Sequence, residues 1–375
     1  MSTITGAPYA GATLTVDLGA IRTNYRLLRS RLGATACAAV VKADAYGLGA
    51  AAVAPALAAE GCRTFFVAHL DEALALRPLL PEAEIFVLNG LAAGAEPECA
   101  PHQVTPVLNS LAQVDAWAAL GRRLGRAVPA ALQVDSGMSR LGLGEAELDK
   151  LAASPERLDA IQLRLVMSHL ACAERQDHPM NREQLRRFGA ARARLPKALT
   201  SLANSSGIFL DPDFHFDLAR PGAALYGLAP VAGAASPMRP VVRLKGRIVQ
   251  VREVAAGAAV GYGASWRTTG PRRIATVAVG YADGYLRSLG NRRTAFAGDA
   301  PVPLVGVVSM DTATFDVTDA PQAVEGGFLE LIGPKNPVDA LAAEAGTIGY
   351  EILTAIGDRY TRIYADPAQI ERLTA

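Results

Sequence analysis

Cysteine is scarce in this chain, and its spacing excludes two common kinds of site. The four cysteines are Cys37, Cys62, Cys99 and Cys172 in 375 residues. No C-x-x-C pair occurs, so the spacing indicates neither a zinc site nor a disulfide framework. We therefore expect reduced thiols, no bound metal and a cytoplasmic location.

Net charge and long apolar runs are also lacking. The formal net charge is +1, which gives no reason to expect a nucleic acid or an anionic membrane as partner. No window reaches the ~18 uncharged apolar residues of a membrane span. The stretch Met1 to Ala12 has neither a basic region nor an apolar core, so no signal peptide is expected.

Alternating apolar and amphipathic segments fill the first two-thirds of the chain. Strands are expected over residues 13–16, 36–41, 64–68, 85–88, 104–108, 130–134, 163–168, 200–202 and 216–218. Helices are expected after Asp17, near 50–60, over 110–120 and over 182–195. About eight βα units in ~225 residues are what a TIM-type (β/α)8 barrel needs, although a doubly wound open sheet alternates in the same way. The lack of G-x-G-x-x-G after the first strand argues against a dinucleotide-binding sheet.

The sequence pattern changes near residue 235. Gly233 to Pro237 is typical of a linker, and β-rich runs follow it. These runs cover residues 241–253, 273–279, 303–308, 313–317 and 328–332, with helices expected over 337–345 and 350–356. We therefore predict an α/β chain with a (β/α)8 barrel over residues 1–236 and a mainly β domain over residues 237–375.

Polar residues follow several of the expected barrel strands. They are Lys42, His69, Asn89, Arg140, His169, Asn204 and Arg220. In a barrel, such strand ends converge on one mouth, where side chains from distant parts of the sequence meet. Taken singly, each residue is better explained as the polar start of a loop, and His69 and Asn89 keep that interpretation. A lysine, a histidine, an Asn-Ser pair and an arginine at four different strand ends together favour a shared site.

Lys42 lies at the end of an apolar run. Burial there would lower the pKa of its amine and make it a nucleophile toward a carbonyl group. A lysine that extends to the surface fits the local run equally well. The following Tyr46-Gly47-Leu48-Gly49 favours a ligand site, because glycines let the backbone approach a ligand and a tyrosine hydroxyl can bind a phosphate.

Motifs along nearly the whole chain resemble those of the alanine racemase family, which uses pyridoxal phosphate. They are Val41-Lys42-Ala43-Asp44-Ala45-Tyr46-Gly47, Val134-Asp135-Ser136-Gly137-Met138-Ser139-Arg140, Ser168-His169, Ala203-Asn204-Ser205, Arg220-Pro221-Gly222, Gly261-Tyr262-Gly263, Val279-Gly280-Tyr281, Ser309-Met310-Asp311 and Gly349-Tyr350-Glu351. The resemblance implies a barrel followed by a β domain, in a homodimer with shared active sites, and an enzyme that supplies D-alanine for peptidoglycan.

The resemblance also implies a role for each matched residue. Lys42 would hold the cofactor as a Schiff base and move the α-proton on one face of an amino-acid substrate, and the partner's Tyr262 would move it on the other. Inversion through a planar carbanion needs such a group on each side. His169 would contact the tyrosine, and Arg220 would contact both His169 and the ring nitrogen of the cofactor. The remaining expected residues are Tyr46, Asn204, Ser205, Gly222 and Tyr350 around the cofactor, Arg140 near the cofactor's phenolic oxygen and the substrate carboxylate, and Tyr281, Met310 and Asp311 completing the substrate site from the second subunit.

Three positions depart from the family pattern. Many members have a lysine that becomes carbamylated where this chain has Gln133, and glutamine cannot form a carbamate, so we predict that none exists here. Gln133 could still orient Arg140 with a neutral hydrogen bond, or a bound anion could replace the carbamate. Leu48 replaces a frequent histidine and Ser139 a frequent glycine.

Other functions remain open at this point. A racemase for serine, or one of broader specificity, would differ by ~1–3 kcal/mol of pocket contacts, which the sequence does not fix. A decarboxylase on the same barrel would carry a Gly-Gly-Gly phosphate loop and a cysteine motif, and we find neither. A regulatory protein that binds the cofactor without catalysis would lack the second domain and hence Tyr262.

Overall fold

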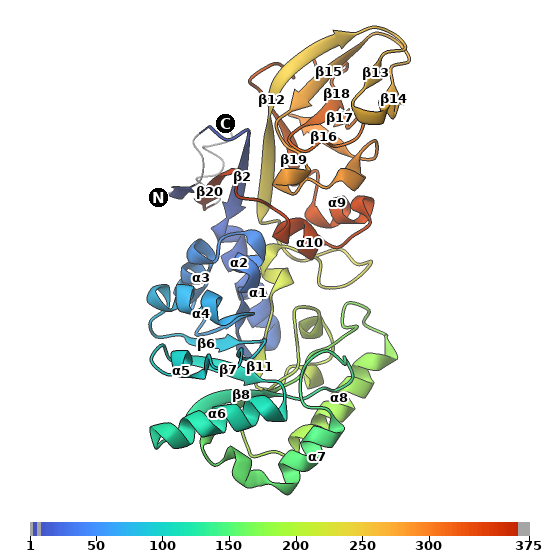
Figure 1. Cartoon of the computed structure of the whole chain (residues 1–375). Coiled ribbons are helices and arrows are strands. Elements are labelled where there is room, and N and C mark those ends of the chain that lie inside the picture. Colours follow the sequence, from blue (N-terminus) through green and yellow to red (C-terminus); the bar gives the residue numbers. More distant parts are fainter. Residues whose placement is uncertain (1–2, 6–8, 367–375) are drawn as a thin grey trace.

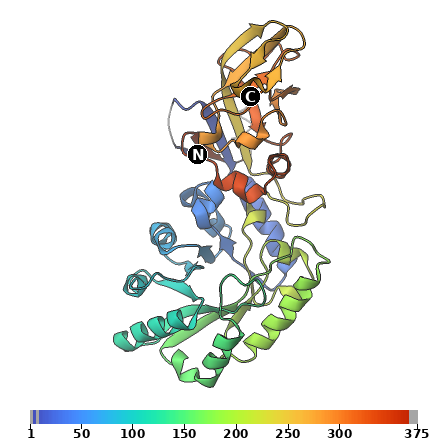
Figure 2. The same ribbon diagram turned by 45° about the vertical axis from the view of Figure 1, so that its right-hand side comes forward.

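The computed structural model of the chain describes residues 3–5 and 9–366. Part of the stretch Met1 to Ala12, where no signal peptide is expected, and the end of the second predicted domain lie outside these residues. Figures 1 and 2 show two stacked bodies, a parallel barrel with outer helices and a mainly β domain.

A ring of parallel strands forms the first body. The strands are β3 (Ala36–Cys37), β4 (Ala39–Val40), β5 (Thr64–Val67), β6 (Glu84–Val87), β7 (Val104–Leu108), β8 (Val128–Gln133), β9 (Ile161–Met167), β10 (Leu199–Ser201) and β11 (Leu218–Ala219). They pair in the order β10-β9-β8-β7-β6-β5-β4, while β3 pairs with β11. A bridge between Asn204 and Arg220 joins the end of β10 to that of β11 and closes the ring. The predicted TIM-type barrel is therefore confirmed, and the open sheet is wrong.

Helices lie between these strands. They are α1 (Leu18–Leu32), α2 (Lys42–Gly47), α3 (Ala50–Ala59), α4 (Leu70–Leu76), α5 (Glu96–Cys99), α6 (Leu111–Leu124), α7 (Glu145–Ala153) and α8 (Pro179–Arg192). The 3-10 turns are η1 (Arg77–Leu79), η2 (Pro155–Leu158), η3 (Ser206–Phe209), η4 (Pro212–Phe214), η5 (Ala223–Tyr226), η6 (Tyr262–Ala264), η7 (Tyr281–Asp283) and η8 (Arg287–Leu289). Helix α1 shows why the pattern predicted these elements. The Asp17 carboxylate caps it by accepting from the Ala20 amide at 2.8 Å, and its apolar stripe from Ile21 to Leu32 is buried.

The second body is built on a mixed sheet. Its strands are β1 (Thr3–Thr5), β2 (Ala12–Asp17), β12 (Val242–Val254), β13 (Ala259–Val260), β14 (Trp266–Arg267), β15 (Arg272–Val277), β16 (Thr294–Ala297), β17 (Ala300–Pro303), β18 (Ala313–Asp316), β19 (Phe328–Ile332) and β20 (Thr361–Ala365). Helices α9 (Val338–Ala345) and α10 (Gly349–Thr354) complete it, and α10 packs on α2 of the barrel.

Two expectations differ from this arrangement. The strand expected over residues 13–16 exists as β2, but it pairs with β12 and β20 and so belongs to the second sheet. The chain therefore passes through the β domain before it enters the barrel. The strand expected over 303–308 is wrong, because β17 ends at Pro303 and only Leu304 forms a bridge, to Phe315.

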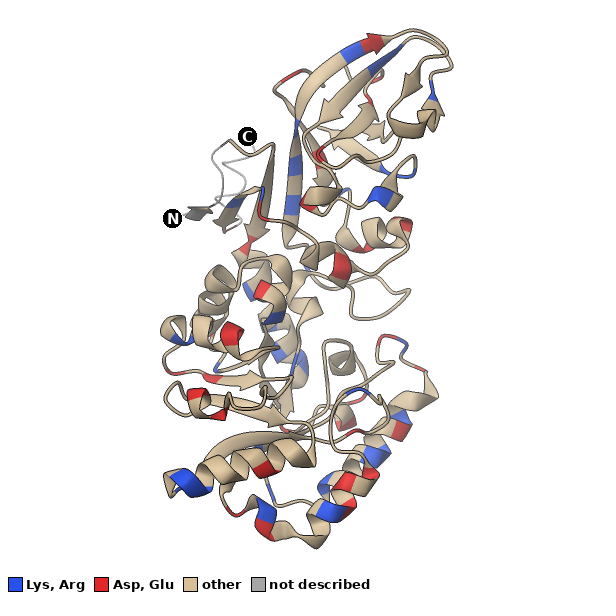
Figure 3. Cartoon of the chain, viewed as in Figure 1, with Lys and Arg blue, Asp and Glu red and all other residues tan. Residues whose placement is uncertain are grey.

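Basic and acidic residues are interspersed along the ribbon of both bodies (Figure 3). Among the described residues, no helix is both long enough and apolar enough to cross a bilayer. In the same part of the chain, no three His, Cys, Asp or Glu side chains gather in a way that could hold a metal ion.

Candidate active site

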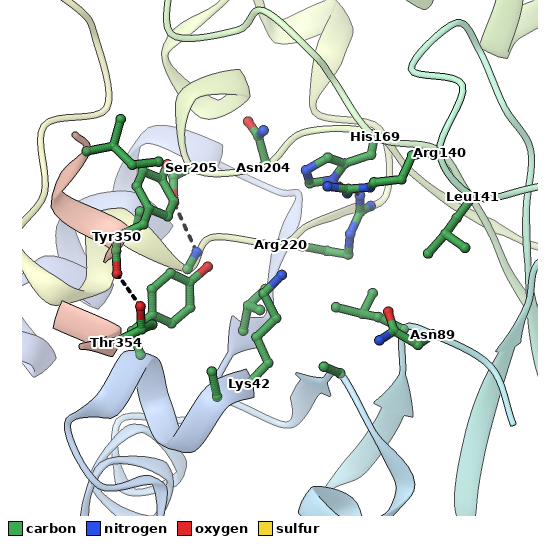
Figure 4. Close-up of a pocket in the computed structure, with 18 of the residues that line it drawn as sticks. Lys42, Asn89, Arg140, Leu141, His169, Asn204, Ser205, Arg220, Tyr350 and Thr354 are labelled. Atoms are coloured by element: carbon green, nitrogen blue, oxygen red, sulfur yellow. Dashed lines mark hydrogen bonds between the residues drawn. The ribbon is translucent and has the colours of Figure 1, made fainter. Parts of the chain in front are cut away.

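A cavity of about 850 Å³ opens at the mouth of the barrel, beside α10. Every residue expected to bind the cofactor lines it, namely Lys42, Tyr46, Arg140, His169, Asn204, Ser205, Arg220, Gly222 and Tyr350. Figure 4 shows Lys42 pointing toward Arg220, with Ser205 and Tyr350 on one side and His169 and Arg140 on the other. The barrel thus brings most of these side chains together from several strand ends, and α10 adds Tyr350.

The backbone after Lys42 takes an unusual path. Ala43, Asp44, Ala45 and Tyr46 are all left-handed, with φ between 52° and 58°. Each non-glycine residue in this region costs about 1–2 kcal/mol, so the surrounding structure must hold the turn in place. The Asp44 carboxylate accepts from the Ala50 amide at 2.7 Å, and Arg362 donates to the Gly47 carbonyl at 2.7 Å. The turn leaves Lys42 at the cavity and places Tyr46 beside it.

The Lys42 amine is surrounded by groups that disfavour its charged form. Burial lowers its pKa, the Arg140 guanidinium lowers it further, and Glu72 opposes both. A lowered pKa increases the fraction of neutral amine at neutral pH. This is the state that attacks a carbonyl or accepts a proton.

Arg220 and His169 form one polar unit on the cavity wall. Arg220 is buried and donates to the Ser168 carbonyl at 2.6 Å and to the Ser201 hydroxyl. Burial lowers the pKa of its guanidinium to about 9, which leaves it protonated at neutral pH. Its Nη2 lies 3.5 Å from His169 Nδ1.

This contact fixes the tautomer of His169. Because a guanidinium can only donate, Nδ1 accepts and the imidazole proton lies on Nε2. Burial, followed by the charges of Arg220, Arg140 and Lys42, lowers the pKa of His169 to about 3. His169 is therefore neutral near pH 7 and can donate a hydrogen bond through Nε2.

Ser205, Gly222 and Tyr46 form a cradle at one side of the cavity. The Ser205 hydroxyl accepts from the Gly222 amide at 3.0 Å and from the Ala224 amide at 3.1 Å. Its side chain therefore bonds to the chain around Gly222 and does not cap the turn η3 that follows it. A methyl group on Gly222 would lie 2.3 Å from the Tyr46 hydroxyl, so glycine is needed there. Hydroxyl and backbone N–H groups together suit a phosphate.

Tyr350 completes this cradle from α10. Its ring lies 6.0 Å from the ring of Tyr46, which in turn lies 4.7 Å from that of Tyr226. Burial raises the pKa of Tyr350, so its hydroxyl stays protonated and can donate. The close approach of α10 to the turn depends on Gly47, where a methyl group would lie 2.4 Å from the Leu353 carbonyl oxygen.

The loop that carries Arg140 is held by two side chains. The Asp135 carboxylate accepts from the amides of Gly137, Met138 and Ser139 at 2.8–3.1 Å. Gln133 donates to the Leu141 carbonyl at 3.1 Å and so fixes the chain next to Arg140. Among the described residues, Arg140 itself has no hydrogen-bond or ion-pair partner, which leaves its guanidinium for a ligand. Ser139 has φ of 57°, which explains why glycine is frequent at this position.

The four residues expected to act from a second subunit do not line the cavity of their own chain. Tyr262 lies between β13 and β14, at the end of the β domain farthest from the barrel (Figure 1). Tyr262 is 72% exposed, and Tyr281 and Met310 are also exposed. The amides of Tyr281 and Ala282 pair with Ser309 and Met310, which places Tyr281 beside Met310.

Sequence reasoning missed some residues at the site. Asn89, interpreted as an ordinary loop residue, lines the cavity, while His69 is not among the lining residues. Thr347, Ile348 and Thr354 also line it, and no motif marked them. Glu72 contacts the turn after Lys42, and its only signal was its place three residues after His69 at the start of a helix.

Comparisons with known proteins cover both bodies of the chain. The family models for the alanine racemase N-terminal domain and C-terminal domain match residues 16–230 and 241–364. The alanine racemase of Rhodospirillum rubrum is 55% identical over 360 residues, 95% of this chain and 96% of the relative. That of Brucella abortus is 50% identical over 371 residues, 95% and 94% of the two chains. The crystal structure of alanine racemase from Bartonella henselae with covalently bound pyridoxal phosphate is 44% identical, with a TM-score of 0.92 over 95% of this chain and 100% of that one.

Proposed function

The chain belongs to the alanine racemase family, and we propose that it interconverts L- and D-alanine with two bases, Lys42 of one copy and Tyr262 of a second copy. As a member of the family it is an isomerase that uses pyridoxal phosphate. One observation carries the two-base proposal. The cavity collects a lysine, a neutral histidine and a phosphate cradle, whereas Tyr262 lies exposed on another part of the chain.

The residues that line the cavity suit the chemistry of the cofactor. Lys42 would bind its aldehyde carbon, and Ser205, Tyr46, Tyr350 and the backbone at Gly222 would hold its phosphate. When bound, pyridoxal phosphate supplies a conjugated ring that delocalises the electrons left by the departing α-proton. Arg220 would face the ring nitrogen and can only donate a hydrogen bond there, which limits how far the ring withdraws electrons. Asn204, which also lines the cavity, orders its own loop by accepting from the Gly207 amide at 2.9 Å.

Lys42 and Tyr262 would then exchange protons with opposite faces of the substrate α-carbon. Lys42 can take a proton because its pKa is lowered by burial and by Arg140. A tyrosine needs help, since its reference pKa is ~10. His169 would give that help by donating Nε2–H to the phenol oxygen and so stabilising the phenolate. Arg140 would meanwhile hold the substrate carboxylate.

This division of labour requires a homodimer. Tyr262, Tyr281, Met310 and Asp311 are all exposed on the β domain of their own chain. Exposed tyrosine and methionine side chains are typical of a surface that another protein covers. We propose that it covers the cavity of a partner chain, with Tyr262 above the substrate and Tyr281, Met310 and Asp311 completing the pocket wall.

We further propose, from the family, that the enzyme works in the cytoplasm and that its D-alanine supplies cell-wall peptidoglycan. No feature of the cavity favours serine over alanine, so alanine remains the proposed substrate.

The direct test follows racemisation in the purified full-length protein supplied with pyridoxal phosphate. L-alanine should lose its circular dichroism signal as D-alanine forms. Lys42→Ala and Tyr262→Phe should each reduce the rate by roughly 10²-fold or more, the range typical of lost acid/base groups. Racemisation that survives both changes would refute the two-base assignment.

A further inference from the structure

Glu72, in helix α4, makes backbone contacts that go beyond capping its helix. Its Oε2 accepts from the His69 amide at 3.0 Å, the usual bond of a glutamate three residues into a helix. Oε2 also accepts from the Ala68 amide at 2.7 Å, and Oε1 accepts from the Ala43 amide at 2.6 Å. The last two bonds cannot be explained by the cap.

These bonds join the ends of two neighbouring barrel strands. Ala68 and His69 follow β5, and Ala43 follows Lys42 just beyond β4. Each carboxylate oxygen of Glu72 bonds to one strand end. Oε1 accepts from Ala43, next to Lys42 beyond β4, and Oε2 accepts from the residues that follow β5. Glu72 therefore fixes the position of one strand end relative to the other at the mouth of the barrel.

Ala43 is also the first residue of the left-handed turn. It has φ of 52°, and it carries a Cβ, so its conformation persists only where contacts impose it. The Ala43 amide points at Glu72 because of that conformation, and the bond in turn stabilises it. The direction in which Lys42 leaves the backbone depends on the same peptide unit.

Glu72 also acts on the charge of Lys42. Burial and Arg140 lower the pKa of the lysine, and Glu72 is the group that raises it. The glutamate is thus placed to influence both the geometry and the protonation of this lysine.

We propose that Glu72 is a positioning residue for Lys42, which it orients by holding the Ala43 amide with one oxygen and the Ala68 and His69 amides with the other. The inference rests on the proposed role of Lys42 in proton transfer. It assigns to Glu72 no contact with substrate or cofactor.

Glu72→Gln tests this assignment in the full-length holoenzyme. A glutamine has one acceptor oxygen, so its NH2 group must face an N–H group on one of the two sides. We expect amide hydrogen exchange in the segment from Ala43 to Tyr46 to rise about tenfold, since one restraint on the turn is lost. Racemisation should slow by roughly 10- to 100-fold, the effect of a small misplacement of a reacting group. The α-deuterium isotope effect should rise with one enantiomer of 2-deuterioalanine and stay unchanged with the other, because Lys42 serves one face only.

Glu147→Gln is the matched control. Glu147, in α7, also accepts from a backbone amide, that of Leu111 at 3.0 Å, and lies outside the cavity. The Glu147→Gln variant should show the amide exchange, rate and isotope effects of the wild type.

Glu72→Asp keeps the charge and both carboxylate oxygens. Its racemisation rate and amide exchange should lie between those of Glu72→Gln and those of the wild type, which provides a second test if Glu72→Gln does not fold.

The outcomes distinguish a failure of the positioning role of Glu72 from a failure of the proposed two-base function. If Lys42→Ala is inactive but Glu72→Gln and Glu72→Asp behave like the wild type, the positioning role is refuted and the two-base proposal stands. An equal isotope effect for both enantiomers of the Glu72 variants, with a slower rate, would also overturn it, because a general loss of structure acts on both faces. Activity in Lys42→Ala would instead refute the proposed function.

Discussion

Two inactive variants should restore activity to each other if every active site takes Lys42 from one chain and Tyr262 from another. Lys42→Ala leaves Tyr262 intact on the β domain, and Tyr262→Phe leaves the whole cavity intact. The structure supports this experiment, since Tyr262 is 72% exposed and is not among the residues that line the cavity of its own chain. Each variant alone forms only dimers in which both sites lack the same residue.

The size of the recovery follows from the symmetry. Equal amounts of the two variants, dissociated and allowed to reassociate at random, give heterodimers as about half of all dimers. Each heterodimer has one site with both residues and one site with neither. The mixture should therefore reach about one quarter of the wild-type activity per chain, because about half of the sites in about half of the dimers are complete.

The assay measures D-alanine formation before and after mixing, with native mass spectrometry to count heterodimers. A mixture of Lys42→Ala with Arg220→Ala is the matched control, since both residues belong to the same cavity and neither site of that heterodimer is complete. If the first mixture contains heterodimers yet shows no more activity than its components, the shared site is refuted.

Three further results should follow from the site. Gly222→Ala should weaken pyridoxal phosphate binding by roughly 10- to 100-fold in a fluorescence titration, because overpacking costs about 1–3 kcal/mol. The added methyl would lie 2.3 Å from the Tyr46 hydroxyl. An unchanged affinity would refute the proposed phosphate cradle. Intact-mass and crystallographic analysis should find no carbamate at Gln133, and a covalent CO2 adduct beside Arg140 would contradict this expectation. Because burial and neighbouring cations lower the pKa of His169 to about 3, the unfolded chain binds more protons than the folded one between that value and the ordinary 6.5. The wild type should therefore lose thermal stability as the pH falls below 6.5 toward 5, and His169→Asn should lose less; equal losses would contradict the proposed environment.

The barrel was predictable because its signals are local and repeated. Helix α1 has a capping aspartate and a single apolar stripe, and the barrel strand over residues 104–108 has the predicted bounds. The place of β2 was not predictable from such signals. A short strand with alternating apolar and polar residues has the same sequence pattern in either sheet. Only the long-range pairing of β2 with β12 places it in the second sheet.

The candidate site was also predictable only in part. Lys42, His169 and Arg220 follow strands, and the barrel geometry alone requires them to converge. The left-handed turn was not visible, because no pattern of residue types marks four consecutive non-glycine residues with positive φ. The role of Glu72 was missed for the same reason, since its bond with the Ala43 amide depends on the turn and not on the sequence around Glu72.

The two proposed bases are prepared in different ways, and this difference links activity to assembly. Lys42 receives its environment from its own chain, where burial and Arg140 lower its pKa. Tyr262 is exposed on its own chain, and the neutral His169 that would stabilise its phenolate lies in a cavity that it does not reach. A tyrosine in water is a poor base, with a reference pKa of ~10. If the two-base proposal holds, association creates the second base, and a chain held as a monomer would have an acid/base group for one face of the substrate and none for the other.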